Sequence, residues 1–191
     1  MNKKRCTWAK TDIDIKYHDK EWGRVVNDDR MLFELLILEG MQAGLSWNIV
    51  LKKREELRKA FDNFNYNICA KYEDGYLEKQ LTNDKIIRSK LKIYSIRKNA
   101  LAFIKVQKEF GSFFNYMWSF TNYKQINNIN LTASDVASKS ELSSLISKDL
   151  KRREFTFVGE TIIYSYLQAI GIINDHLFDC YCYEKCKINN I

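Results

Sequence analysis

Helical periodicity is the feature that most constrains the fold of this chain. Apolar residues recur at helical spacing through three long stretches, residues 28–38, 46–61 and 86–110. Proline, which breaks helices, is absent, and only 7 glycines occur among the 191 residues. We therefore expect an all-α protein, with shorter helices over residues 66–81 and 112–120.

The length of the chain suits one domain that can bury most of its core. We predict a single domain over residues 1–191, with a helical core over about 28–120 and a second region formed by the termini together with residues 135–183. The polar segment 121–134 is expected to be a surface loop between these two lobes. Ser134 is positioned to cap a helix that runs through Leu150.

The charge of the chain is compatible with a nucleic-acid partner. A formal charge of +7 and a pI near 9.1 are typical of a protein that binds a polyanion. An AT-rich coding sequence would explain the same lysines equally well. No apolar run is long enough to span a membrane and no signal peptide is visible, so we expect a cytoplasmic protein. In that reducing compartment, the 5 cysteines are thiols or metal ligands.

Cysteine and histidine residues near both ends of the chain form a candidate metal site. His176 and Cys180 have i, i+4 spacing, which would place them on one helix face. Two thiolates and two imidazoles make a closed tetrahedral shell for a structural zinc ion. The four candidate ligands are Cys6, His18, His176 and Cys180, with Cys182 and Cys186 as rival ligands. The alternative is that Cys6 is a surface thiol and the histidines are core residues.

Glu39 is hard to explain as a packing residue. It follows the apolar helical run from Met31 to Leu38, and Gly40 is expected to be the C-cap of that helix, where the helix dipole disfavours an anion. Four aromatic residues could join this carboxylate in a dry slot for a flat or cationic ring: Trp8, Tyr17, Trp22 and Trp47. The alternative is that these aromatics belong to the core and that Glu39 pairs with a lysine.

The segment RREFTFVGET, residues 152–161, lies between two helical patterns. A basic run, a short turn with Gly159 and a helix N-terminus are similar to a helix-hairpin-helix, whose backbone N–H groups bind DNA phosphates. The usual hairpin has two glycines and this segment has one, so an ordinary turn between two helices is the alternative.

Together, several segments closely resemble the bacterial DNA-3-methyladenine glycosylase I family. They are RCTWA, YHDKEWG, LFELLILEGMQAGLSWNIVLKKRE, IIRSKLKI and FVGETIIYSYLQAIGIINDH with the following cysteine, and they extend from about residue 5 to 183. The resemblance implies the fold of the helix-hairpin-helix glycosylase superfamily with one structural zinc ion. It also implies base-excision repair in the bacterial cytoplasm, in which a monomeric enzyme hydrolyses 3-methyladenine from alkylated double-stranded DNA without cleaving the strand.

The resemblance also assigns roles to residues of this chain. It places the zinc ligands at Cys6, His18, His176 and Cys180, and the lesion-recognising carboxylate at Glu39. It places the aromatic side chains of the base pocket at Tyr17, Trp47 and Trp8. Asp175 lies where many superfamily members carry a catalytic aspartate, although this family is described as lacking one, and we treat Asp175 as a helper of the reaction.

DNA contacts are expected at two turns. The resemblance implies that residues 42–45 enter the gap left by a flipped base, with Gln42 at the gap, Gly44 allowing close backbone approach and Leu45 as the apolar wedge. Gly159 would meet a phosphate, although Glu160 adds a negative charge beside it. Two rival functions are a zinc-stabilised DNA-binding domain without catalysis and a damage sensor that has lost excision.

Overall fold

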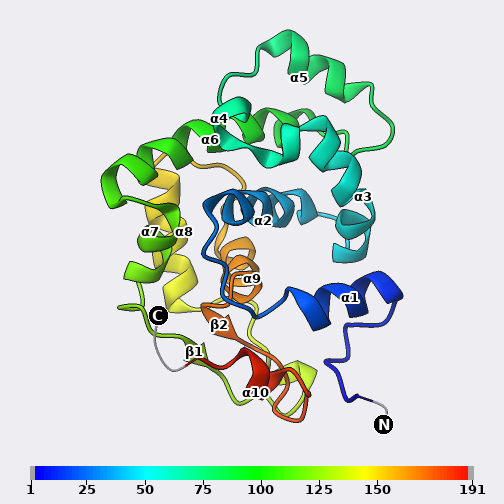
Figure 1. The fold of residues 1–191 in the computed structure, drawn as a ribbon, viewed down its shortest axis with the longest axis vertical. Helices are drawn as coiled ribbons and strands as arrows, with labels where there is room; N and C mark the ends of the chain where they lie inside the picture. The colour runs from blue at the N-terminus through cyan, green and yellow to red at the C-terminus, as the bar shows by residue number, and fades with distance from the viewer. Residues whose placement is uncertain (1–2, 189–191) are drawn as a thin grey trace.

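The computed structural model describes residues 3–188, and most of them are helical (Figure 1). The first part of the chain forms α1 (Asp12–Lys20), α2 (Asp29–Gln42), α3 (Trp47–Ala60), η1 (Asp62–Phe64), α4 (Tyr66–Cys69), α5 (Asp74–Leu81), α6 (Lys90–Phe110) and α7 (Phe113–Ser119). The second part forms β1 (Ile126–Asn127), η2 (Ala133–Asp135), α8 (Glu141–Arg152), α9 (Glu160–Ala169), β2 (Ile173–Asn174) and α10 (Tyr183–Cys186). The predicted α-helical fold class is confirmed, with two very short strands added.

Helix α2 forms the centre of the molecule. Every residue from Leu32 to Met41 is buried, and the helix contacts α3, α6, α7 and α9. The largest hydrophobic cluster includes Leu36 of α2, Phe103 of α6 and Ile163 of α9. Helices from both predicted lobes therefore share one core, and residues 28–120 do not form a core of their own.

Several predicted helix ends were wrong. Helix α2 does not end at Gly40 but continues to Gln42, so Glu39 lies inside its last turn. Gly40 has a packing role instead, because a Cβ atom there would lie 3.0 Å from the Cβ of Phe157. Ser134 lies in η2, and the N-cap of α8 is Ser140, whose hydroxyl accepts a hydrogen bond from the Ser143 N–H at 3.1 Å.

Other helices differ in extent from the prediction. The helix expected over 66–81 is divided into α4 and α5, and the one expected from residue 86 begins at Lys90. The loop 121–134 is less isolated than its polar composition suggests, because β1 pairs in parallel with β2 and Asn130 bridges to Leu177. Two-residue strands carry no periodicity that a sequence pattern could reveal.

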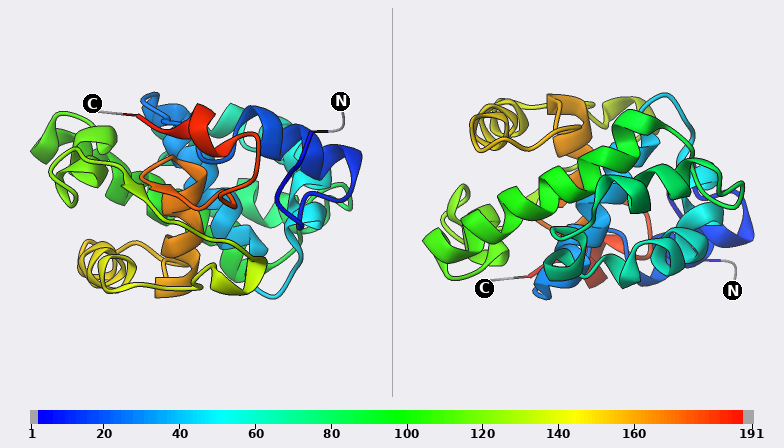
Figure 2. Two further views of the ribbon diagram at one scale, coloured as in Figure 1. Left: turned by 90° about the horizontal axis from the view of Figure 1, so that it is seen from below. Right: turned by 90° about the horizontal axis from the view of Figure 1, so that it is seen from above.

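Helices α8 and α9 form an αα-hairpin, and α8 stands at one edge of the molecule (Figure 2). The turn between them places Glu154 and Phe157 at positive φ and buries the side chains of Phe155 and Val158. The Ser147 hydroxyl donates a hydrogen bond to the Val158 carbonyl at 2.6 Å. The turn is therefore fixed to α8 and to the core, while Gly159 starts α9 on the outside, where an added Cβ would meet no atom within 4 Å.

A buried ion cluster joins the first three helices. Glu34 of α2 is fully buried, and its carboxylate accepts hydrogen bonds from Arg54 at 2.6 Å, Arg58 at 2.7 Å and Arg30 at 2.8 Å. Arg54, on α3, also donates to Glu21 at the end of α1 at 2.6 Å. Burial alone would raise the pKa of Glu34, but the guanidinium groups of Arg58 and Arg54 lower it below its usual value. This cluster fixes α1, α2 and α3 relative to one another.

Within residues 3–188, no helix has the length and apolar character needed to cross a membrane.

A substitution at Gly171, which follows α9, tests how closely this turn packs against the backbone of Arg24. It has φ +81°, and a Cβ atom there would lie 2.5 Å from the backbone carbonyl carbon of Arg24. We expect Gly171→Ala to lower the free energy of unfolding by about 3 kcal/mol, because backbone strain and overpacking add. Gly75→Ala is the control, since nothing lies within 4 Å of the added Cβ in α5. Chemical denaturation that finds equal effects for the two variants would contradict this packing.

Candidate active site and metal centre

A cavity of about 410 Å³ opens between the N-terminal segment, the first three helices and the C-terminal loop. Its volume lies within the range of small-molecule sites. The residues that line it include Cys6, Trp8, Tyr17, Trp22, Glu39, Gln42, Trp47, Ala133, Val136, Gln168 and Asp175. The structure thus brings the four predicted aromatic residues, Glu39 and Asp175 to one site.

Aromatic rings form the walls of the cavity. The ring centroids of Tyr17 and Trp47 are 5.2 Å apart with an interplanar angle of 56°, and those of Trp8 and Trp22 are 5.1 Å apart. Asn48, next to Trp47 on α3, donates a hydrogen bond to the Thr11 hydroxyl, the N-cap of α1, at 2.8 Å. This contact sets the position of Trp47 relative to Tyr17.

Glu39 is buried at the cavity without a counter-charge. The residue is 5 % exposed, and no donor in the described part of the chain forms a hydrogen bond with its carboxyl group. Burial raises the pKa of Glu39 to about 8. The alternative pairing with a lysine is not seen among the described residues, and the buried Lys92 of α6 donates to the backbone carbonyls of Met41 and Ala43.

Two further polar groups of the cavity residues have no partner. The Tyr17 hydroxyl and the Trp47 indole N–H are buried and form no hydrogen bond with the described residues. Buried polar groups are nearly always hydrogen-bonded, and exceptions need an explanation. One acceptor and two potential donors therefore remain free for a ligand that stacks against the aromatic rings.

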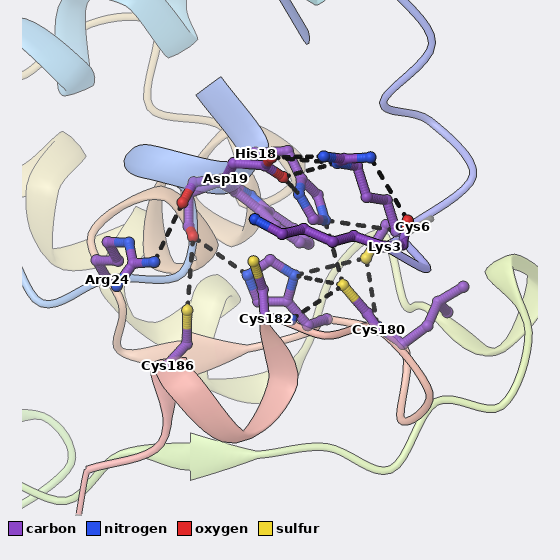
Figure 3. A network of polar contacts seen from close by, with 12 residues as sticks. Lys3, Cys6, His18, Asp19, Arg24, Cys180, Cys182 and Cys186 are labelled. Atoms are coloured by element: carbon purple, nitrogen blue, oxygen red, sulfur yellow. Dashed lines mark hydrogen bonds and ion pairs between the residues drawn. The ribbon is translucent and has the colours of Figure 1, made fainter. Parts of the chain in front are cut away.

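The four predicted metal ligands are all buried and lie together, and Figure 3 shows Cys6, His18 and Cys180 of this group. The Cys180 sulfur is 3.4 Å from Nε2 of His18 and 3.6 Å from Nδ1 of His176, and the Cys6 sulfur is 3.5 Å from the same Nδ1. Sulfur and nitrogen atoms bound to one tetrahedral zinc ion at normal lengths are about 3.5 Å apart. The cluster therefore has the donor types and the spacing that zinc requires.

The second ring nitrogen of each histidine also has a partner. Nδ1 of His18 lies 2.9 Å from the carboxylate of Asp19, and Nε2 of His176 lies 3.2 Å from the Trp22 carbonyl. Such contacts orient imidazole ligands in metal sites. Each of these histidines has an aspartate beside it in the sequence, Asp19 after His18 and Asp175 before His176. Only Asp19 takes this role, because Asp175 is bonded elsewhere.

The rival cysteines fit the metal site less well. A hydrogen bond with Cys182 lowers the pKa of Cys180, which favours the thiolate form that binds metal. Cys182 forms a second, smaller group with His18 and Asp19, and the Cys186 sulfur lies 3.9 Å from the Trp22 carbonyl. The prediction that His176 and Cys180 share a helix was wrong, because residues 175–182 form turns between β2 and α10.

The metal cluster and the cavity share side chains. The ring of Trp8 lies 5.4 Å from that of His18, and the ring of Trp22 lies 4.5 Å from that of His176, both edge-on. Cys6 belongs to the cluster and also lines the cavity. A metal ion that fixes the cluster would therefore also fix one wall of the cavity.

Asp175 occupies a buried hydrogen-bond network at the cavity. One carboxylate oxygen accepts from the side-chain amides of Asn128 and Asn130 at 2.7 and 2.9 Å. The other accepts from the Tyr164 hydroxyl at 2.8 Å and the Gln168 amide at 2.7 Å. No sequence signal identifies these four partners, because they come from the loop 121–134 and from α9 and share no motif with Asp175.

The two candidate DNA-contacting turns are on the surface. Gly44 is exposed with φ +75°, and Leu45 is 37 % exposed between α2 and α3. Glu160, whose charge was a concern beside Gly159, is paired with Lys139 at 2.7 Å and accepts a hydrogen bond from Ser144. These partners offset the negative charge of Glu160 next to the start of α9.

Comparison with known proteins shows what class of protein has this fold. The chain is 44% identical over 179 residues to the DNA-3-methyladenine glycosylase of Haemophilus influenzae, covering 93% of this chain and 97% of the relative. It is 41% identical to DNA-3-methyladenine glycosylase 1 of Escherichia coli, covering 96% and 98%. Both of these relatives, which match most of the chain, are DNA glycosylases.

Solved structures and a family profile agree with the similarity to DNA glycosylases. A crystal structure of 3-methyladenine DNA glycosylase I superimposes with a TM-score of 0.92 at 40% identity, covering 94% of this chain and all of that chain. A tyrosine-to-phenylalanine variant of such an enzyme, in complex with 3-methyladenine, superimposes with a TM-score of 0.91 at 31% identity, covering 98% and 99%. The profile of the methyladenine glycosylase family matches residues 8–183. The chain belongs to the methyladenine glycosylase family.

Metal content tests the ligand assignment. We expect the purified protein to contain about one zinc ion per chain, as a closed four-ligand site requires. Cys180→Ser should lose stoichiometric zinc, whereas Cys186→Ser should retain it, because the Cys186 sulfur faces the Trp22 carbonyl and not the cluster. Elemental analysis of both variants after dialysis gives the answer. Zinc lost only from Cys186→Ser would contradict the assignment.

The unpaired carboxyl of Glu39 predicts a pH-dependent stability. Its pKa of about 8 in the folded protein is above the value of about 4.3 for an unfolded chain, so its ionisation opposes folding as the pH rises between these values. We expect Glu39→Gln to be more stable than the native protein at pH 9 and the difference to vanish near pH 4. Denaturation across this range measures it. A difference that grows toward low pH would contradict a raised pKa.

Proposed function

We propose that this protein is a monofunctional DNA glycosylase that removes 3-methyladenine from alkylated double-stranded DNA and leaves an abasic site. The observation that carries the proposal is the buried, unpaired Glu39 carboxyl in a cavity walled by Tyr17, Trp47 and Trp8. The names of the relatives and of the solved structures support this substrate.

The proposed chemistry depends on charge. Methylation at N3 makes adenine formally cationic within DNA, so its glycosidic bond is already weakened. Once the base is flipped into the cavity, its charge would favour the ionised form of Glu39, whose pKa is held near 8 only while no cation is present. The carboxylate and the aromatic faces would stabilise the cation, and the free Tyr17 and Trp47 groups are available to orient it.

The proposed reaction is a simple hydrolysis. The glycosidic bond breaks with its electron pair moving to the base, which leaves as neutral 3-methyladenine. Water adds to C1′ of the sugar and releases a proton to solvent. We assign no Schiff-base step to any lysine, so no strand cleavage is expected.

Asp175 has a supporting role in this proposal. Its two carboxylate oxygens already accept four hydrogen bonds, from Asn128, Asn130, Tyr164 and Gln168, which occupies the positions that a general base would use to accept a proton from water. Its negative charge at the cavity would still favour positive charge that develops on the sugar. Asp175 therefore helps as a fixed charge and as a link between α9 and the loop 121–134.

DNA engagement is assigned to the two surface turns. Leu45 would fill the space vacated by the flipped base, with Gln42 beside it and Gly44 allowing close approach of the backbone. The backbone at Gly159 would bind a phosphate at the N-terminus of α9. The metal ion would be structural, since all four of its ligand positions come from Cys6, His18, His176 and Cys180.

A zinc-stabilised DNA-binding domain without catalysis is the rival function. Such a domain has no use for a buried carboxyl without a partner, which disfavours folding at neutral pH. A damage sensor would use Glu39 but would not release the base. Only product analysis separates the sensor from the enzyme.

The test is to incubate the protein with freshly methylated duplex DNA and to identify the released base. We expect free 3-methyladenine and intact strands. Glu39→Gln should lower the excision rate by about 100-fold, the typical loss when a charge-stabilising group is removed, while binding to undamaged duplex stays the same. Glu73→Gln, an exposed glutamate before α5, is the control and should excise normally.

Other outcomes of this experiment would support one of the rival functions or a folding role for Glu39. Binding that prefers methylated DNA without release of the base would support the sensor. Salt-sensitive binding with no preference for methylated DNA would support the plain DNA-binding domain. Equal loss of excision and of undamaged-duplex binding in Glu39→Gln would indicate that Glu39 has a folding role.

A further inference from the structure

We propose that Lys92 of α6 is a positioning residue for DNA intercalation, because its ammonium group holds the end of α2 and thereby the turn 43–46 that carries Leu45. The inference rests on the proposed function, in which Leu45 enters the duplex. It concerns a side chain outside the cavity and the metal cluster.

The backbone hydrogen bonds at the end of α2 show what Lys92 does. The last carbonyls of a helix have no partner within the helix. The Gly40 carbonyl accepts from the Ala43 N–H at 3.3 Å, and the Gln42 carbonyl accepts from the Leu45 N–H at 2.7 Å. The Met41 carbonyl, which lies between these two, and the Ala43 carbonyl, which follows them, accept from the Lys92 ammonium at 2.9 and 2.6 Å. One side chain thus completes the end of the helix.

The environment of Lys92 fits a role in holding the end of α2. The residue is 8 % exposed and forms no ion pair with a described acidic residue, and burial lowers its pKa from the usual value. Helix α2 has no basic residue in its own last turn, so its partially negative end is met by a charge from α6. A buried ammonium is costly unless its hydrogen bonds are satisfied, and here two carbonyls accept them.

The turn held by Lys92 links the cavity to the wedge. Glu39 lies in the last turn of α2, Trp47 is the first residue of α3, and Leu45 is exposed between them. The C-cap Ala43 has φ −49° and ψ 115°, and Gly44 after it has φ +75°. The Leu45 N–H nevertheless bonds to Gln42 and not to the carbonyl of Gly40, as it would in a Schellman motif, so the backbone leaves the Met41 carbonyl to Lys92. Without Lys92, the turn would keep only two backbone contacts to α2, from the Ala43 N–H to Gly40 and from the Leu45 N–H to Gln42.

Two measurements on Lys92→Met separate wedge positioning from general support of the fold. The first is excision from methylated duplex DNA, which needs both the cavity and the wedge. The second is binding of free 3-methyladenine, followed by calorimetry, which needs the cavity alone. We expect excision to fall about tenfold or more, as for the loss of charged hydrogen bonds to buried carbonyls, and free-base binding to change less than about twofold.

Hydrogen exchange provides a readout besides activity. Amides in residues 42–46 of Lys92→Met should exchange faster than in the native protein, whereas those in the middle of α6 should be unchanged. Lys92→Arg keeps a buried cation that can donate to the same carbonyls, and it should recover part of the lost excision. Lys98→Met, which removes an exposed lysine from the same helix, should behave as the native protein.

The outcomes distinguish this inference from the proposed function. If the native protein releases no base, the proposed function fails, and faster exchange at 42–46 would still support the structural part of the inference. If native excision is normal, an equal loss of excision and free-base binding in Lys92→Met overturns the inference. Normal excision by Lys92→Met also overturns it. If Lys92→Met does not fold, Lys92→Arg and Lys92→Gln are compared by the same two measurements.

Discussion

The buried carboxylate of Glu34 fixes the frame on which the cavity is built. Arg54 and Arg58 reach it from α3, Arg30 reaches it from its own helix, and Arg54 also binds Glu21 after α1. A buried charge that lost these partners would destabilise the fold strongly. Because α1, α2 and α3 carry the cavity residues, the geometry of the site depends on this cluster.

A second buried glutamate on the same helix, Glu39, has no charged partner among the residues that the structure describes. Glu39 is also buried, yet no arginine or lysine of the described chain pairs with it, and its pKa rises to about 8 while that of Glu34 falls. Burial has the same effect on both, and the difference is the set of partners. On the same helix, Glu34 is neutralised by arginines and Glu39 has no partner in the described part of the chain. The carboxyl group of Glu39 therefore stays available for a cationic ligand.

Much of the site could be predicted from the residues, and the reasons for the failures are physical. Glu39 stood out as a charge in an apolar helix, and two cysteines with the only two histidines suggested a metal cluster. Glu34 gave the same signal in the same helix but was not singled out, since only its arginine partners distinguish the two. Lys92 gave no signal, because it acts on backbone carbonyls that are far away in the sequence.

The sequence by itself determined the helices and the supply of side chains that can hold zinc or a charged ring, because periodicity and residue chemistry are local properties. Only the tertiary structure decided that α2 passes beyond Gly40, that Asp175 is saturated by four donors and that Lys92 closes the end of α2. These are properties of pairs of segments. Whether a buried polar group is satisfied depends on which distant segment packs against it, and that is set by the fold.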